Sequence, residues 1–172
     1  PKPFKCDKSR QATMGYGYGA SVTSIQMVSA VSALANNGIR VTPHVIKYSP
    51  EEEEEKIQKI QALSPATAKT VTALLAQSVQ NSKSAVNLDK YTVAAKTGTS
   101  RKPIEHGKGY SNSLIGSVIG YFPAKDPQVL IYVVVDSAST GGPVWGNTVA
   151  APVFKEVANQ VARILNIPPD KN

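Results

Sequence analysis

The sequence has few residues that bind metals or form disulfides. Cys6 is its only cysteine, so no disulfide can form within the chain. His44 and His106 are its only histidines, and they form no cluster with the spacing of metal ligands. Long apolar runs are also absent, since no segment approaches the roughly 18–20 apolar residues of a membrane-spanning helix. These absences exclude a disulfide framework, and we expect neither a metal nor another cofactor.

The composition is that of a globular domain with an excess of positive charge. The 172 residues are 41% hydrophobic and 18% charged, enough for one domain with a buried core. The net charge of +7 comes from 19 basic and 12 acidic residues, and five of the acids adjoin one another at Glu51–Glu55. Such a surface can favour nucleic acid, anionic lipid or a carboxylate substrate. Because the lysines are scattered and not interleaved with aromatic residues, we do not expect nucleic-acid binding.

The first part of the chain, over about 23–81, predicts helices. Thr23 with Gln26 three residues later is a capping-box signature, and Gly38 can end this helix in a left-handed conformation. The many Ala and Ser residues of the segment predict a helix that is buried on several sides. Its expected apolar stripe consists of Ile25, Val28, Val31 or Ser32, and Ala35.

A second helix is expected to begin at Ser64, which can cap it, with Pro65 in the first helical position. Between the two helices, the Glu51–Glu55 charge run predicts a solvated loop. The apolar residues that carry the second helix forward are Val71, Leu74, Leu75 and Val79.

Three strand candidates follow, at 91–99, 113–122 and 128–136, so the expected sheet spans about 91–136. The last two candidates are joined by "PAKDP", which is too short for a parallel crossover and predicts an antiparallel hairpin. The third candidate, "QVLIYVVVD", is almost continuously apolar, which predicts that it is covered on both faces.

A C-terminal helix is expected over about 149–165, with Pro152 in its first turn and Phe154 beside its apolar stripe. Helices at both ends of the chain and antiparallel strands between them predict an α+β layered fold. No repeat or long linker divides residues 1–172, so one domain is expected. The apolar stripe of the C-terminal helix should be Val153, Val157, Val161 and Ile164 or Leu165.

The segment "YTVAAKTGTS" ends an apolar run with a cation and several hydroxyl groups. Because strand side chains alternate, Thr97 and Thr99 are expected on one face and Lys96 on the other. Gly98 lets another backbone approach closely. Hydroxyls, a free backbone N–H and a nearby ammonium suit a ligand that lies along the strand and ends in a carboxylate. The plain alternative is a strand that ends in a turn.

The tripeptide "KTG" is one of three signatures of penicillin-binding proteins and class A β-lactamases. The segments "GYGYGASVTSIQMVSAVSALANNG", "KTGTS", "GSVIGYFPAKDPQVLIYVVVD" and "VAAPVFKEVANQVARIL" resemble, in that order, the C-terminal half of a penicillin-binding protein transpeptidase domain. The resemblance covers nearly the whole chain. The chain looks most similar to the monofunctional class B members, which cross-link peptidoglycan in cell division. It implies a penicillin-binding, β-lactamase-like fold in which helices flank an antiparallel sheet.

The other two signatures, S-x-x-K and S-x-N, occur nowhere in the sequence. In the family both precede the segment that resembles "GYGYGASVT". The nucleophilic serine, its lysine and the second serine are therefore expected upstream of Pro1, on the N-terminal half of the same domain. This chain alone should be inactive. A non-catalytic β-lactam sensor or scaffold of the same fold is the alternative.

The resemblance also implies roles for residues of the "KTGT" segment. Lys96 would supply positive potential and hydrogen bonds beside the missing serines. Thr97 and Thr99 would hold the substrate carboxylate, with Gly98 between them. The backbone N–H of Thr99 would be one oxyanion donor, and the second donor would lie on the absent serine.

Arg101 and Trp145 match positions that line the site in division-type members of the family. Arg101 would add a second cation for the carboxylate, and Trp145 would bring an aromatic ring near the substrate. The residues alone leave plainer alternatives open: a solvated strand-end lysine for Lys96, a surface arginine in a mobile loop, and a partly buried tryptophan.

The partners that the resemblance implies are the D-Ala-D-Ala end of a peptidoglycan stem peptide, β-lactams, the N-terminal half of the protein and other cell-division proteins. It also implies a location at the extracytoplasmic, periplasmic face of the bacterial cell membrane, with the anchoring segment outside this chain. Nucleic acid is not among the expected partners.

Overall fold

The structure is a computed structural model and describes residues 8–82, 84–104, 109–139 and 142–171. Cys6 and His106 lie outside the described residues. In these ranges no helix is both long and apolar enough to cross a membrane. The elements in chain order are α1 (Lys8–Met14), α2 (Ser24–Ala35), β1 (Ile39–Val41), α3 (Pro50–Lys56), β2 (Lys59–Gln61), α4 (Pro65–Asn81), β3 (Ala94–Pro103), β4 (Tyr110–Phe122), β5 (Val129–Asp136), the π-helix η1 (Gly146–Ala150) and α5 (Ala151–Ile164).

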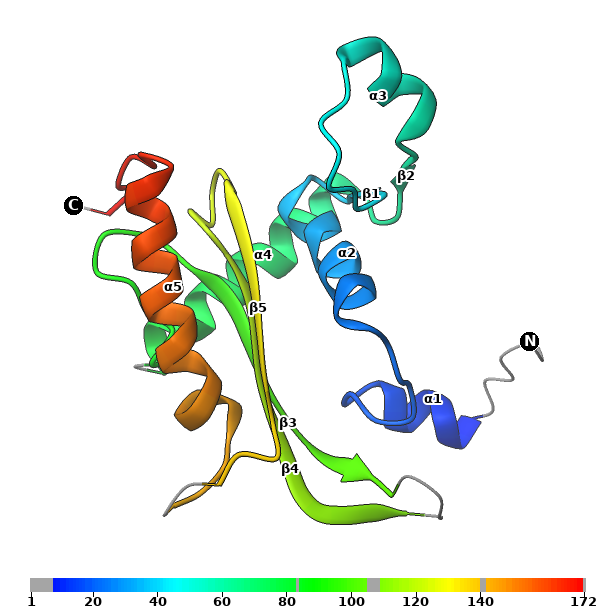
Figure 1. The fold of residues 1–172 in the computed structure, drawn as a ribbon, viewed down its shortest axis with the longest axis vertical. Helices are drawn as coiled ribbons and strands as arrows, with labels where there is room; N and C mark the ends of the chain where they lie inside the picture. The colour runs from blue at the N-terminus through cyan, green and yellow to red at the C-terminus, as the bar shows by residue number, and fades with distance from the viewer. Residues whose placement is uncertain (1–7, 83, 105–108, 140–141, 172) are drawn as a thin grey trace.

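An antiparallel sheet in the order β3-β4-β5 forms the centre of the structure (Figure 1). β4 and β5 form the predicted hairpin, with Phe122 opposite Val129 beside the turn. Helix α5 covers one face of the sheet, and α2 and α4 cover the other. β5 contacts both α2 and α5, as its continuous apolar pattern predicts, but its residues are at most partly buried and Val134 is 43% exposed. The expected α+β fold, with helices flanking an antiparallel sheet, is confirmed.

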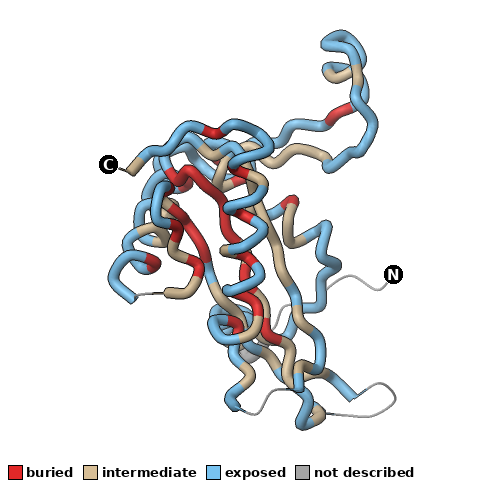
Figure 2. The backbone as a smooth tube through the Cα atoms, turned by 60° about the vertical axis from the view of Figure 1, so that its left-hand side comes forward, coloured by how far each residue is buried: buried red, intermediate tan, exposed pale blue. Residues whose placement is uncertain are grey.

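Apolar residues on the two faces of the sheet form two separate core clusters. The larger cluster lies against α5 and contains Val118, Phe122 and Phe154, none of which has exposed surface. The smaller contains Ala94 and Tyr121 and packs against residues of α2 and α4. Buried residues occur in β3 and β4 and in the helices that pack on the sheet, whereas β5 has none (Figure 2). Because neighbouring strand residues point to opposite faces, Tyr121 and Phe122 enter different clusters.

Glu51–Glu55 lie in helix α3, so the prediction of a solvated loop is wrong. The Ser49 hydroxyl accepts from the Glu52 backbone N–H at 3.3 Å, and the Glu52 carboxylate accepts from the Ser49 N–H at 3.2 Å. Acidic side chains in a first turn are favoured by the helix dipole, and Lys56 pairs with Glu52 at 2.7 Å. This capping box and ion pair outweigh the repulsion between neighbouring glutamates.

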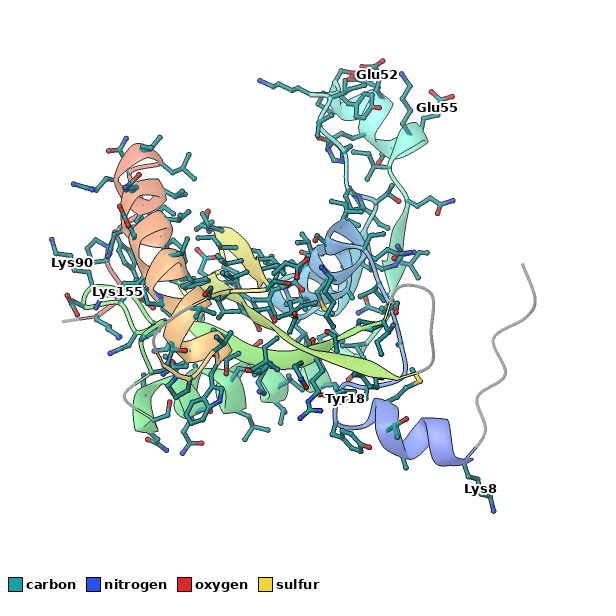
Figure 3. The ribbon with its side chains drawn as sticks, turned by 60° about the horizontal axis from the view of Figure 1, so that its bottom comes forward. Lys8, Tyr18, Glu52, Glu55, Lys90 and Lys155 are labelled. Carbon is teal, nitrogen blue, oxygen red and sulfur yellow. The ribbon has the colours of Figure 1, made fainter. Side chains whose placement is uncertain are left out.

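Helix α3 lies at the end of an arm that extends away from the sheet (Figure 1). Strands β1 and β2 pair antiparallel at the base of the arm, with Arg40 opposite Ile60. Glu52 and Glu55 lie far from the sheet at the tip (Figure 3). The two short strands were not predicted, because three residues are too few to establish a period of two.

Helix α5 buries a different face from the predicted one. Val153 and Val157 are 46% and 39% exposed, and Ile164 is 75% exposed. The buried residues lie one position further along the chain, which rotates the buried face by about 100°. Small side chains dominate that face, so the helix can lie close to the sheet. Its buried residues are Ala151, Phe154, Ala158 and Ala162.

Helix α2 begins and ends as predicted, but its burial differs. Thr23 and Gln26 form the capping box, and Gly38 has a left-handed φ of 85°. The buried residues of the helix are Ser29 and Ala33, while Ile25 from the predicted stripe is 57% exposed. Val31 and Ala35 of the predicted stripe are partly buried against the smaller core cluster, so the stripe is correct at these positions and wrong at Ile25.

The C-terminal tail fixes the approach to β3. The Tyr91 hydroxyl donates to the Ile167 carbonyl at 2.8 Å, which joins the strand entrance to the end of the chain. The Thr92 N–H donates to Asp170 Oδ1 at 2.7 Å, and the Thr92 hydroxyl donates to the other oxygen of that carboxylate. Lys171 Nζ donates to the Leu88 carbonyl at 2.7 Å. These bonds hold the segment that leads into β3.

Tyr121→Phe should lower the free energy of unfolding by about 1 kcal/mol, measured by urea denaturation. The Thr72 hydroxyl donates to the Ala68 carbonyl at 2.8 Å, so the Tyr121 hydroxyl is the donor in its 2.7 Å bond to Thr72. The variant loses that bond from a side chain that is 1% exposed. Tyr16→Phe, at a side chain that is 69% exposed, is the control and should change the free energy by less than about 0.5 kcal/mol. Equal changes in both variants would contradict the assignment.

Candidate functional site

The "KTGT" segment lies on β3, an edge strand of the sheet. β3 pairs with β4 on one side, and on the other side it has no strand partner among the described residues. The backbone N–H and C=O groups of an unpaired edge can bind an extended peptide as an added strand. The segment is therefore placed where a peptide-like ligand could lie alongside it.

Side chains alternate along this part of β3. Lys96 lies on the sheet face that α2 and α4 cover, and Thr97 and Thr99 lie on the face of η1 and α5. Lys96 and Thr99 are exposed and Thr97 is half-buried, so none of these side chains is sealed in the core. The Lys96 ammonium donates to the Thr97 carbonyl at 2.8 Å, and it has no serine partner among the described residues.

Gly98 stands at a close contact between three segments. A Cβ on Gly98 would lie 2.8 Å from the Oγ of Ser117, its partner on β4. From the other side, the backbone of Gly146 approaches so closely that a Cβ there would lie 2.5 Å from the Gly98 carbonyl oxygen. Gly98 thus permits the close backbone approach that the sequence indicates for this position.

The first residue of η1 contacts the end of the motif directly. The Gly146 backbone N–H donates to Thr99 Oγ1 at 3.1 Å. This contact joins two segments 47 residues apart in the sequence. Sequence reasoning did not identify Gly146, although a glycine at the start of a helix was the available signal in "VWGNT".

Trp145 precedes Gly146 and is 58% exposed, so it is not the partly buried tryptophan of the plain alternative. Its backbone is held in place by the loop around it. The Trp145 N–H donates to Thr148 Oγ1 at 2.9 Å, and the Thr148 hydroxyl lies 2.8 Å from the Pro143 carbonyl oxygen and 2.9 Å from that of Trp145, either of which can accept its hydrogen. The exposed ring is therefore attached to an ordered turn next to Thr99.

Arg101 is exposed and lies on the same face of β3 as Thr99, opposite Leu114 on β4. It belongs to the strand and not to a loop. The pairing with β4 shifts in register between Arg101 and Pro103. No hydrogen bond or ion pair engages the guanidinium within the part of the chain that the structure describes.

A charge pair crosses the sheet at the end of β3. Lys102 Nζ lies 2.8 Å from Asp136 Oδ2 on β5, and the Ser137 hydroxyl donates to Asp136 Oδ1 at 2.8 Å. The Lys102 hydrogen bond, followed by that of Ser137, holds the pKa of Asp136 below its usual value. Both members of the ion pair are exposed, so the pair contributes little to stability.

Two cavities of about 350 Å³ lie away from the motif. One is lined by Thr13, Tyr16, Tyr18, Gly19 and Tyr110. The Tyr18 and Tyr110 rings meet edge to face there, with their centroids 5.8 Å apart. The other lies beside α2 and is lined by Ile25, Gln26, Ser29, Ala30, Arg40 and Pro43. No group of His, Cys, Asp and Glu in the described ranges is arranged to hold a metal ion.

The sequence matches a family model described as "Penicillin binding protein transpeptidase domain" over residues 1–159. Stage V sporulation protein D of Bacillus subtilis (strain 168) is 37% identical over 171 residues, which cover 94% of this chain and 26% of that protein. The probable peptidoglycan D,D-transpeptidase PenA of Neisseria flavescens is 32% identical over 166 residues, covering 95% of this chain and 40% of that protein.

Among solved structures, the TP domain of Burkholderia pseudomallei penicillin-binding protein 3, in its apo form, superposes with a TM-score of 0.82 at 32% identity. The match covers 94% of this chain and 48% of that one. The chain therefore spans between a quarter and a half of the length of these relatives.

The Lys102→Met variant should raise the pKa of Asp136 toward its ordinary value, as followed by NMR titration of the carboxylate. Ser137→Ala is the matched control and should raise the pKa by less, because the Lys102 bond is the larger cause of the depression. A depressed folded pKa favours folding above the unfolded pKa of Asp, and this contribution is lost as the pH falls through the folded value. A larger rise in Ser137→Ala than in Lys102→Met would refute the assigned order of causes.

Proposed function

The chain belongs to the transpeptidase domain family of penicillin-binding proteins, and we propose that it is the C-terminal part of a serine-type peptidoglycan D,D-transpeptidase. The observation that carries the proposal is the "KTGT" segment on an unpaired edge strand, with accessible Lys96 and Thr99. The nucleophilic serine and its lysine belong to polypeptide outside this chain. Relatives named as peptidoglycan D,D-transpeptidases support the same reaction class.

The reaction is an acyl transfer through a covalent intermediate. The serine oxygen attacks the carbonyl carbon of the penultimate D-alanine, the peptide C–N bond breaks, and the terminal D-alanine leaves with a proton on its nitrogen. An amine from a neighbouring stem peptide then attacks the ester, which restores the serine and forms the cross-link. A β-lactam follows the first step, but its ring-opened acyl group stays attached and stalls the enzyme.

The edge strand would hold the stem peptide in an extended conformation beside the nucleophile. Lys96 supplies positive potential on one face of β3, where the absent serines would approach. Thr97 and Thr99 bind the terminal carboxylate through their hydroxyls, and the Thr99 N–H donates to the oxyanion of the tetrahedral intermediate. The support for these roles is the alternation of the side chains and the accessibility of Lys96 and Thr99.

Arg101 and Trp145 would extend the binding surface beyond the motif. The exposed guanidinium of Arg101 lies on the Thr99 face and can add a second cation for the carboxylate. The exposed ring of Trp145 precedes the residue that contacts Thr99, so it can pack against the substrate backbone or a β-lactam side group.

A peptidoglycan substrate supports a location at the outer face of the bacterial cell membrane, where this polymer is cross-linked. The order of the family segments supports a class B enzyme of the cell-division type, with other division proteins and the N-terminal half of its own domain as partners. Exposed apolar residues on α2 and α5, Ile25 and Ile164 among them, offer surfaces against which that half can pack.

The 172-residue chain should form no covalent adduct with a fluorescent penicillin, whereas the complete protein should be labelled on one serine outside this chain. The reason is that no S-x-x-K occurs in the sequence. Labelling is read on a denaturing gel, and the modified peptide is located by mass spectrometry. An adduct on a serine of this chain would contradict the placement of the nucleophile, and an unlabelled complete protein would favour the scaffold alternative.

In the complete protein, Lys96→Met should slow acylation by penicillin about tenfold to a hundredfold, because the site loses a charged hydrogen-bond donor. Lys69→Met removes another exposed lysine, on α4, and should leave the rate within about twofold of wild type. Stopped-flow fluorescence gives the second-order rate constants. If both variants slowed the reaction equally, net charge and not the position of Lys96 would explain the effect.

A further inference from the structure

The hydrogen bond between Gly146 and Thr99 determines which way the Thr99 hydroxyl can act. A hydroxyl has one hydrogen to donate and two lone pairs that accept. Thr99 Oγ1 accepts the Gly146 N–H at 3.1 Å. Its own hydrogen has no acceptor among the described residues, so it remains available to a ligand.

Gly146 can make this bond because it has no side chain. A Cβ there would lie 2.3 Å from the Ser117 carbonyl oxygen and 2.5 Å from that of Gly98. Both atoms belong to the backbone of the sheet, so neither can move aside cheaply. The glycine is needed for close approach of the η1 backbone to β3 and β4.

The position of Gly146 at the start of a helical run also explains why its N–H is free for Thr99. η1 (Gly146–Ala150) continues directly into α5, and the first N–H groups of a helix have no partner inside it. The Gly146 N–H is satisfied instead by the Thr99 hydroxyl. The fold therefore pairs the backbone N–H at the start of η1 with Thr99 of the "KTGT" segment.

We propose that Gly146 is a positioning residue, whose N–H holds the Thr99 hydroxyl oriented as a hydrogen-bond donor to the substrate carboxylate. This inference rests on the proposed transpeptidase function. In this proposal Gly146 makes no bond to the substrate itself and acts only through its N–H bond to Thr99. A carboxylate accepts hydrogen bonds and cannot donate them, so a hydroxyl fixed as a donor matches it.

The test compares acylation of the complete protein by a penicillin with a free carboxylate and by its methyl ester. The ester lacks the negative charge that Thr99 would bind, so the ratio of the two rates reports this interaction. Gly146→Ala should lower the carboxylate-to-ester ratio about tenfold. Gly142→Ala is the matched control in the same loop, because an added Cβ there meets open space, and the ratio should not change.

Thr99→Val should lower the ratio by a similar factor, and Gly146→Ala should then add no further change. Thr99→Ser keeps the hydroxyl and should retain most of the ratio. The inference is overturned if Gly146→Ala slows both compounds equally, or if its effect on the ratio persists in the Thr99→Val background. Failure of the penicillin with the free carboxylate to acylate the wild-type protein would count against the proposed function instead.

Amide hydrogen exchange provides a second measurement that does not require Gly146→Ala to fold. In protein labelled with 15N-glycine, the Gly146 amide should exchange faster in Thr99→Val than in wild type, and Thr99→Ser should resemble wild type. Unchanged exchange in Thr99→Val would show that the Gly146 N–H does not depend on the Thr99 hydroxyl, and would overturn the inference.

Discussion

The pairing of β3 with β4 is the interaction on which the rest of the candidate site depends. Its register sets Thr99 opposite Gly116 and Gly98 opposite Ser117. A slip of one residue would exchange the faces of Lys96 and Thr99. The same register decides which apolar residues of β3 and β4 face α5 and which face α2 and α4. The pairing that forms the two core clusters therefore also places the "KTGT" side chains.

Glycines make this arrangement tight enough for η1 to join the site. Gly116 lies beneath Val149, and a Cβ there would approach the valine Cγ2 to 2.4 Å. On the neighbouring strand β3, the backbone of Gly98 lies against the backbone of Gly146 at the start of η1. Because backbone touches backbone at this point, the distance between the motif and the start of the C-terminal helix is set by the main chain, and side-chain rearrangement has little influence on it.

Much of the fold follows from local signals. The caps at Thr23 and Ser64 and the antiparallel hairpin depend on a few adjacent residues, and all three are present as predicted. The buried face of α5 did not follow, because tertiary packing selected its alanines over its larger valines. Helix α3 was missed because a run of like charge hid the cap at Ser49. In the site, alternation placed Lys96, Thr97 and Thr99, but the contact of Gly146 with Thr99 links distant segments and leaves no local pattern.

The arm that carries α3 makes the charge of the molecule strongly uneven. Residues 50–56 hold five glutamates and one lysine, a net charge of −4, so the remaining chain carries +11. Since the arm extends away from the sheet, its negative charge is separated from the basic residues that the structure describes on the sheet and the helices packed on it, which gives the chain a permanent electric dipole. Near an anionic polymer the body is attracted and the tip repelled, so the molecule approaches with a preferred orientation, which weakens as salt screens the field.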